Sequence, residues 1–177
     1  MAIDTSAKLL AELQTRSAGL PIQTVRADFD SLRQLVEPQS ADVAVCMRDT
    51  LTHLPSKTGV SKLFSDACRA LKAGGLVVLT FRDRTPTMSG LDRFVPVRSD
   101  ADKIMTCFLE CESSETVVVQ DMIHLRNGSE WTLHKSSYRK LRLAPDWVCS
   151  ELAAAGFRIQ RDEPPGRLCA VTASKQS

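Results

Sequence analysis

The hydrophobic pattern is most regular between residues 41 and 83. An apolar run at residues 43–47, rich in β-branched side chains, has the length of a strand that is buried on both faces. Apolar residues from Val60 to Leu71 recur at the i, i+3, i+4 and i+7 spacing that is typical of an amphipathic helix. A second apolar run follows at residues 76–81. The pattern therefore predicts a strand, a crossover helix and a second strand that runs parallel to the first.

Charged side chains follow both predicted strands. Arg48 and Asp49 come directly after the first strand, and Arg82 and Asp83 come directly after the second. In an open parallel sheet, ligands bind beyond the carboxyl ends of the strands. These four residues are therefore candidates for a binding site, with a surface ion pair as the alternative for Arg82 and Asp83.

Apolar runs and turn residues predict elements on both sides of this unit. A helix that begins at residues 4–6 is expected to turn Leu9, Leu10 and Leu13 inward and to end near Gly19. The other predicted elements are strands at residues 22–27, 103–111, 116–126, 130–138, 157–161 and 167–173, a short helix that ends at Val36, and a helix from Pro145 to Gly156.

Turn residues predict how the later strands are connected. Asn127 and Gly128 separate two strands and form a strong hairpin signal, because both residues tolerate positive φ. The segment Pro164-Pro165-Gly166 is expected to connect the last two strands as an antiparallel hairpin. Residues 82–102 show no sustained hydrophobic periodicity and are predicted to form a long loop. Loops of this length usually have a function.

Length and charge narrow the class of protein. The 177 residues fit one domain, and a net charge of +2 gives no electrostatic argument for binding nucleic acid or an anionic membrane. The basic run at residues 135–142 is interpreted as a solvated strand face. The sequence has neither a stretch of membrane-spanning length nor the start of a signal peptide, so we expect a cytoplasmic protein whose partner is a small molecule.

The six cysteines are scattered, mostly within apolar runs, and form no CxxC pair. Buried thiols are the expected state, because a cysteine without a disulfide packs as a small hydrophobic residue. Cys107 and Cys111 can share one face of a strand, but no further ligands can be placed beside them, so no metal site is expected.

With these elements placed, the chain resembles the class I S-adenosylmethionine-dependent methyltransferases that act on small molecules. The resemblance rests on AIDTSAKLL, VRADFD, ADVAVCMRDTLTHL and RALKAGGLVVLTFRD, which occur in the order and at the spacing of that family. The final AAGFRIQR and RLCAVTASK resemble the strand pair that closes the family's sheet. The resemblance implies an α/β fold with a Rossmann-like sheet, mostly parallel with an antiparallel closing hairpin. It also implies a single domain, residues 1–177, with an antiparallel β insertion at residues 86–143 that covers the substrate.

The resemblance implies roles for three residues in binding the adenosyl part of S-adenosylmethionine. Asp4 stands where the family's acidic residue accepts hydrogen bonds from the ribose hydroxyls, and a helix cap is the alternative role. Asp28 matches the acidic residue that binds the adenine amino group, with a surface turn as the alternative. Phe29 would lie beside the adenine ring.

The resemblance implies that the end of the first central strand and the loop after it take part in both cofactor binding and methyl transfer. Cys46, Met47 and Arg48 match residues that line the adenosyl and methionine parts, although Met47 could equally pack in the core. Asp49 and His53 would lie near the transferred methyl group. His53 is the natural general base, with a role in bracing the loop as the alternative, and many such enzymes act mainly by aligning donor and acceptor.

Three residues are candidates for contacting the methyl acceptor. Arg82 follows the second central strand, and His134 and Tyr138 have an even spacing that places them on one face of the predicted hairpin. All three would therefore lie near the proposed substrate cover.

The sequence departs from the family at its start. Family members carry a first strand and a glycine-rich loop before the segment that matches AIDTSA, and this sequence contains no GxGxG. Losing two or three hydrogen bonds to charged cofactor groups would weaken binding by at least about a hundredfold. We therefore expect S-adenosylmethionine-dependent methyl transfer to an oxygen or nitrogen of a small molecule, by a truncated chain that can be inactive alone. The alternatives are a non-catalytic chain that pairs with a second copy or with a complete methyltransferase subunit, and an unrelated α/β binding module.

Overall fold

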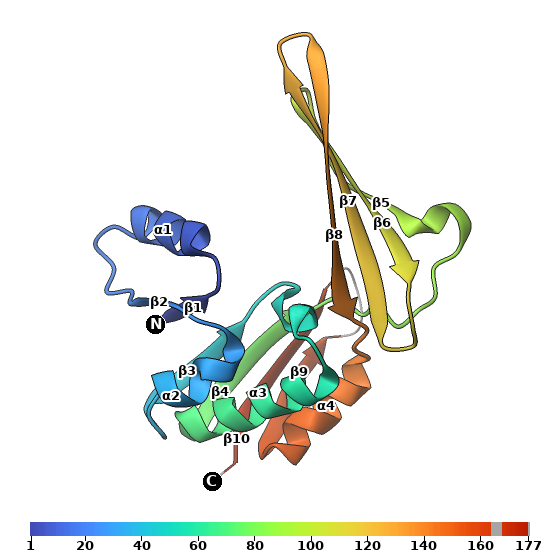
Figure 1. Cartoon of the computed structure of the whole chain (residues 1–177). Coiled ribbons are helices and arrows are strands. Elements are labelled where there is room, and N and C mark those ends of the chain that lie inside the picture. The colour runs from blue at the N-terminus through green and yellow to red at the C-terminus, as the bar shows by residue number, and fades with distance from the viewer. Residues whose placement is uncertain (164–167, 177) are drawn as a thin grey trace.

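A computed structural model describes residues 1–163 and 168–176 of the chain, and Figure 1 shows how they are arranged. The described residues form three separate β-sheets. A two-stranded sheet lies at the N-terminus, a four-stranded central sheet carries two helices, and a second four-stranded sheet projects away from both.

The N-terminal lobe is built from the first two strands and one helix. Strand β1 (Ala2–Asp4) pairs in parallel with β2 (Thr24–Arg26), and α1 (Ala7–Arg16) connects them. Ser6 is the N-cap of α1, since its hydroxyl accepts a hydrogen bond from the backbone N–H of Leu9 at 3.3 Å. Leu10 is buried as predicted, but Leu9 is 55% exposed, because the small sheet covers only part of the helix.

The central sheet has the strand order β3-β4-β10-β9. Strand β3 (Ala41–Cys46) runs parallel to β4 (Leu71–Phe81), as the crossover pattern predicts. Strands β9 (Phe157–Glu163) and β10 (Cys169–Lys175) form the predicted antiparallel pair, and β10 also pairs antiparallel with β4. The expectation of a mostly parallel sheet is therefore wrong, because β10 lies between β4 and β9 and runs antiparallel to both, so that only β3 and β4 form a parallel pair in this sheet. The turn predicted at Pro164-Pro165-Gly166 lies outside the described residues.

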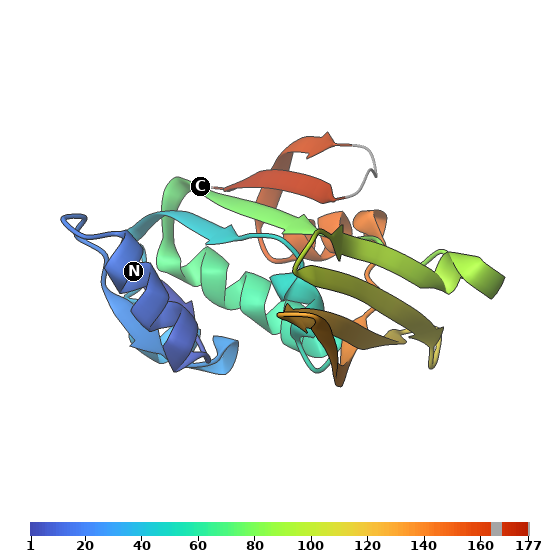
Figure 2. The same cartoon turned by 90° about the horizontal axis from the view of Figure 1, so that it is seen from above.

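Helices α3 (Lys57–Ala70) and α4 (Pro145–Ala154) pack side by side on one face of the central sheet, as Figures 1 and 2 show. Ser56 caps α3 by accepting a hydrogen bond from the backbone N–H of Gly59 at 3.1 Å. The core between helices and sheet contains fully buried side chains such as Phe64, Phe81, Phe157, Leu152 and Val171. Short helical segments connect these elements, namely η1 (Phe29–Ser31), α2 (Leu32–Leu35) and η2 (Thr50–His53).

Strand β3 differs from the prediction of a strand buried on both faces. Val43 is 51% exposed and Val45 is 61% exposed, because they alternate with Ala44 and Cys46, which pack against the core, and so point to the opposite face of β3. An apolar groove of about 420 Å³ runs between the residues of β1 and those of β3. The apolar pattern of β3 is thus real, but the core covers only one face of the strand.

The projecting sheet is antiparallel throughout, in the order β5-β6-β7-β8. Strands β6 (Lys103–Cys111), β7 (Thr116–Asn127) and β8 (Glu130–Leu141) confirm the three predicted strands and the hairpin. Gly128 occupies the turn with a φ of 66°, and Asn127 belongs to β7.

The prediction of a long loop at residues 82–102 is only partly right. The segment contains η3 (Gly90–Arg93) and strand β5 (Phe94–Ser99). Pro96 obscured the strand in the sequence, since proline is tolerated in a sheet mainly at an edge, and β5 is the edge strand beside β6.

Two further findings concern membrane spans and cysteines. Among the described residues, no helix combines the length and the apolar character needed to cross a membrane. Cys169 is buried, whereas Cys111 is exposed, so the expectation of buried thiols is wrong for Cys111, which lies at the end of β6.

Candidate functional site

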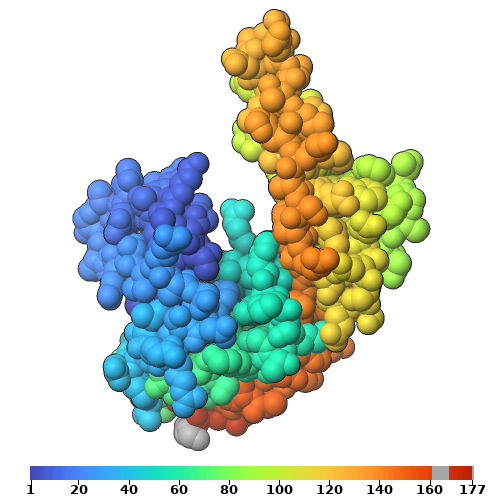
Figure 3. Space-filling view, viewed as in Figure 1, coloured from blue at the N-terminus to red at the C-terminus, as the bar shows by residue number. Residues whose placement is uncertain are grey.

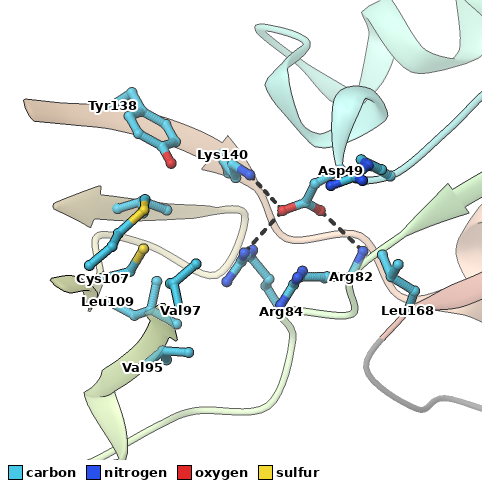
Figure 4. Close-up of a pocket in the computed structure, with 13 residues that line it drawn as sticks. Asp49, Arg82, Arg84, Val95, Val97, Cys107, Leu109, Tyr138, Lys140 and Leu168 are labelled. Atoms are coloured by element: carbon cyan, nitrogen blue, oxygen red, sulfur yellow. Dashed lines mark hydrogen bonds and ion pairs between the residues drawn. The ribbon is translucent and has the colours of Figure 1, made fainter. Parts of the chain in front are cut away.

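Asp49 lies where the central sheet meets the projecting sheet, and Figure 4 shows its contacts. Its Oδ2 accepts hydrogen bonds from Lys140 Nζ at 2.5 Å and from Arg84 Nη2 at 3.0 Å. Its Oδ1 accepts one from the backbone N–H of Arg82 at 3.1 Å. The carboxylate therefore joins the end of β3, the segment after β4 and the base of β8.

The electrostatics of this cluster favour a charged Asp49. Burial by itself would raise the pKa of the carboxyl, but the hydrogen bonds and positive charges of Lys140 and Arg84 outweigh it and lower the pKa to about 2. Burial, together with the charges of Arg84 and Arg82, lowers the pKa of Lys140 despite its hydrogen bond and ion pair with Asp49. A permanently charged, fully engaged carboxylate is a poor proton acceptor, so Asp49 is better suited to positioning its neighbours.

A second carboxylate, that of Asp121, is buried on β7 beside Cys107 and Tyr138. Cys107 Sγ donates a hydrogen bond to Asp121 Oδ1 at 2.9 Å. Burial and the charge and hydrogen bond of Asp121 raise the pKa of Tyr138 to about 12. The Tyr138 phenol, whose ordinary pKa is 10.0, is therefore harder to ionise in the folded protein.

The raised pKa of Tyr138 is directly measurable, because Tyr138 is the single tyrosine of the chain. In an ultraviolet absorbance titration, the phenol of the folded protein is expected to ionise near pH 12 rather than near its ordinary value of 10.0. Asp121→Asn removes the negative charge and should shift the midpoint back toward 10.0. Asp102→Asn, at an exposed position, should leave it in place. An unchanged midpoint in Asp121→Asn would contradict the role given to Asp121.

His53 stacks on Tyr138 with a ring-centroid distance of 5.4 Å. Burial lowers the pKa of His53, and the charges of Lys140 and Arg84 lower it further against the opposing effect of Asp49. The imidazole is therefore neutral at pH 7 and able to accept a proton.

The two stacked rings line different cavities, Tyr138 the first and His53 the second. The first, here called the cationic cavity, has a volume of about 500 Å³ and is lined by Tyr138, Asp49, four cationic side chains and an apolar wall from the projecting sheet. The second, here called the N-terminal cavity, has a volume of about 600 Å³ and contains Asp4, Asp28, Phe29 and His53. In Figure 3 a wide notch separates the blue N-terminal lobe from the projecting sheet.

The structure brings some of the predicted site residues together and separates others. Asp4 is the last residue of β1 and Asp28 comes two residues after β2, and the carboxyl ends of these strands are adjacent because the two strands are parallel. Arg48 and Arg82 lie in the cationic cavity with Asp49 and Tyr138 rather than with Asp4 and Asp28.

Three other predicted site residues lie outside both cavities. Cys46 faces the apolar groove beside β3, and Met47 is 49% exposed. His134 is exposed on β8, four residues or about 13 Å of strand from Tyr138, so sharing a face does not bring it to the cavity.

Sequence reasoning missed four residues of the site, namely Arg84, Cys107, Asp121 and Lys140. The basic run at residues 135–142 was predicted to be solvated, yet Lys140 is only 6% exposed and Arg142 only 7%. The sequence did carry a signal for this burial. Tyr138, Lys140 and Arg142 are spaced by two, and residues with this spacing lie on the same face of a strand.

The same reasoning applies to Asp121. It continues the inward positions of Val117 and Val119 along β7, and a charge at such a position indicates a paired or functional group.

Comparison with solved structures identifies the fold. An S-adenosylmethionine-dependent methyltransferase from Clostridium acetobutylicum superposes with a TM-score of 0.78 at 14% identity, over 99% of this chain and 74% of that one. The CcbJ methyltransferase from Streptomyces caelestis gives a TM-score of 0.79 at 16% identity, over 99% and 74%. A sugar N-methyltransferase from Streptoalloteichus gives 0.75 at 12% identity, over 99% and 70%. The chain therefore has the fold of the class I S-adenosylmethionine-dependent methyltransferases, which confirms the class of fold that the resemblance implied.

A family comparison assigns the first part of the chain. Residues 1–75 match the model of the family described as methyltransferase domain. No curated protein matches the sequence significantly. The matched segment includes Asp4, Asp28, Asp49 and His53.

Proposed function

We propose that this protein transfers a methyl group from S-adenosylmethionine to an oxygen or nitrogen atom of a small molecule. The observation that carries the proposal is that the stacked rings of His53 and Tyr138 each line one of two neighbouring cavities. One cavity suits the cofactor and the other suits the acceptor. Their junction is where a methyl group would pass from one to the other.

The N-terminal cavity fits the adenosyl part of the cofactor. One carboxylate oxygen of Asp4 accepts a hydrogen bond from the backbone N–H of Ser6 at 2.7 Å. One carboxylate oxygen of Asp28 accepts a hydrogen bond from the hydroxyl of Ser31 at 3.1 Å. The second oxygen of each carboxylate has no partner in the described part of the chain, so each can accept a ribose hydroxyl or an amino group. Phe29 offers an aromatic ring beside them. When bound, the cofactor supplies an electrophilic methyl group.

Catalysis in this proposal depends on orientation first and proton acceptance second. The cavities would align donor and acceptor for in-line displacement. His53 is neutral and lies at the junction, so it is the proposed base for a hydroxyl or ammonium acceptor. Asp49 would act by holding Lys140 and Arg84 in place.

The projecting sheet is the proposed substrate cover. Residues 86–143 include all four of its strands, and Tyr138, Lys140 and the apolar wall of the cationic cavity come from them. The single domain predicted for residues 1–177 would then combine a cofactor-binding part with this cover.

Calorimetric titration with S-adenosylhomocysteine, the reaction product, tests the proposal. Binding is expected for the wild type, and Asp4→Ala and Asp28→Ala should each weaken it by about tenfold or more, because each removes a charged hydrogen-bond acceptor. Asp42→Ala is the matched control, since its exposed carboxylate pairs with Lys72 away from both cavities.

The same titration addresses the second candidate function, a non-catalytic chain that pairs with a partner subunit. The exposed edge of β3 and the apolar groove beside it favour this candidate, because an unpaired strand edge invites pairing with another chain. The absence of heat up to millimolar ligand would contradict a self-sufficient methyltransferase and leave the pairing chain as the better explanation.

A further inference from the structure

The cationic cavity has an unusual charge for its size. Four cationic side chains line it, namely Arg48, Arg82, Arg84 and Lys140, against the single carboxylate of Asp49, which gives a net of +3 among its described lining residues. The segments that supply them follow β3, follow β4 and end β8, so tertiary structure assembles the cluster. Lys140 and Arg84 are largely buried and share Asp49, whereas Arg48 and Arg82 are exposed and can be reached by an incoming anion.

Two of the four cations have unengaged guanidinium groups. Lys140 and Arg84 share Asp49, but the buried Nε of Arg84 has no hydrogen-bond partner. The guanidinium groups of Arg48 and Arg82 make no hydrogen bond or ion pair within the described residues. A guanidinium presents parallel N–H groups that match the two oxygens of a carboxylate or phosphate.

The backbone at Arg48 supports a functional role for its side chain. Arg48 has a φ of 61°, in the left-handed region that non-glycine residues seldom occupy. Its backbone N–H donates to the hydroxyl of Thr80 on the neighbouring strand, which holds this conformation. Backbone strain of this kind persists where the surrounding structure enforces it, often at binding sites.

The opposite wall of the cavity is apolar. Val95, Val97, Met105, Leu109 and Val119 contribute to it from β5, β6 and β7. A volume of about 500 Å³ is that of a pocket for a compact organic molecule. The cavity thus combines a cationic end with an apolar body.

We infer that the cationic cavity binds a methyl acceptor that has an apolar body and an anionic group, either carboxylate or phosphate. This inference rests on the proposed function for the identity of the ligand as the acceptor. The cofactor also carries a carboxylate, but Asp4, Asp28 and Phe29 assign its adenosyl part to the other cavity. The carboxylate of the cofactor is on its methionine part, so the test below includes S-adenosylhomocysteine with Arg82→Gln to distinguish that carboxylate from the anionic group of the acceptor.

Paired probes test the inference by calorimetry. 4-Phenylbutyrate and 4-phenylbutyramide share an apolar body and differ in charge, and phenyl phosphate supplies the second anion. The wild type should bind at least one of the anions about tenfold or more tighter than the amide, because a charged hydrogen bond exceeds a neutral one. Arg82→Gln and Arg48→Gln should each remove most of that preference. Arg158→Gln, an exposed residue of β9, changes the net charge equally and should leave the preference intact.

The outcomes separate this inference from the proposed function. If the anions bind no better than the amide, or not at all up to millimolar concentration, the inference is wrong whatever the cofactor result. If Arg82→Gln weakens S-adenosylhomocysteine but leaves anion binding unchanged, the cations serve the cofactor and the inference is likewise wrong. If the anion preference depends on Arg82 while S-adenosylhomocysteine does not bind, the anion site stands and the proposed methyl transfer fails.

Discussion

Asp49→Asn is expected to lower the free energy of unfolding by roughly 2 to 5 kcal/mol. The side chain of Asp49 is 14% exposed and those of Lys140 and Arg84 are 7% and 14% exposed. Removing the carboxylate charge would leave two largely buried cations facing each other. Urea unfolding at pH 7 measures the change, and Asp42→Asn, at an exposed ion pair, should change stability little. A loss below about 1 kcal/mol in Asp49→Asn would contradict the central role of the cluster.

The pH dependence of stability provides a second measurement of the same group. The folded pKa of Asp49, about 2, lies below the ordinary value of 3.8. The ionised Asp49 carboxylate therefore stabilises the folded state by about 2 kcal/mol. This stabilisation is fully present above the ordinary pKa of 3.8 and is lost as the pH falls through the folded pKa. Asp49→Asn should flatten the acid limb of the stability curve in that range. An identical acid limb in wild type and variant would assign acid destabilisation to other groups.

Arg142→Leu is expected to destabilise the protein by at least about 3 kcal/mol, because three carbonyl groups lose a charged hydrogen-bond donor. Arg142 Nε donates to the carbonyl of Arg84 at 2.9 Å, and its two other nitrogens donate to those of Thr85 and Ser113, each at 2.6 Å. Arg142 is only 7% exposed and joins the segment after β4 to the β6–β7 connection. Its loss should therefore also loosen the segment that carries Arg84.

Arg139→Leu provides the matched control for Arg142→Leu. Arg139 lies on β8 three positions earlier and pairs with Glu112 at the surface, where water can replace the interaction. Denaturant unfolding of both variants, with hydrogen exchange at residues 84 and 85, measures stability and local order. Equal stability of the two variants would mean that Arg142 does not hold the two sheets together.

Local patterns predicted most of the secondary structure. The crossover unit, the helix at residues 145–154 and the β7–β8 hairpin follow from periodicity and turn residues, because these signals depend on neighbours in the sequence. Strand β5 was missed because Pro96 breaks its pattern, and only pairing with β6 makes it a strand. The mixed central sheet was missed because strand order depends on contacts between distant segments.

The candidate site was predictable only in part, for a related reason. Asp4, Asp28 and Phe29 follow short strands directly, so their grouping could be expected from the rule that ligands bind at strand ends. Lys140 and Asp121 lie within long strands of the projecting sheet, where a charged residue suggests solvent exposure until its partners are known. Their burial depends on how this sheet rests against the segments after β3 and β4.

The sequence by itself determined most of the helices and strands and the class of fold, since these depend on the spacing of apolar residues and on the order of the elements. Tertiary structure alone decided that Asp49 would meet Lys140, which is 91 positions away, and that Arg84 would share the same carboxylate. The physical reason is that pairing of buried charges depends on distance and desolvation, and neither is encoded in local spacing.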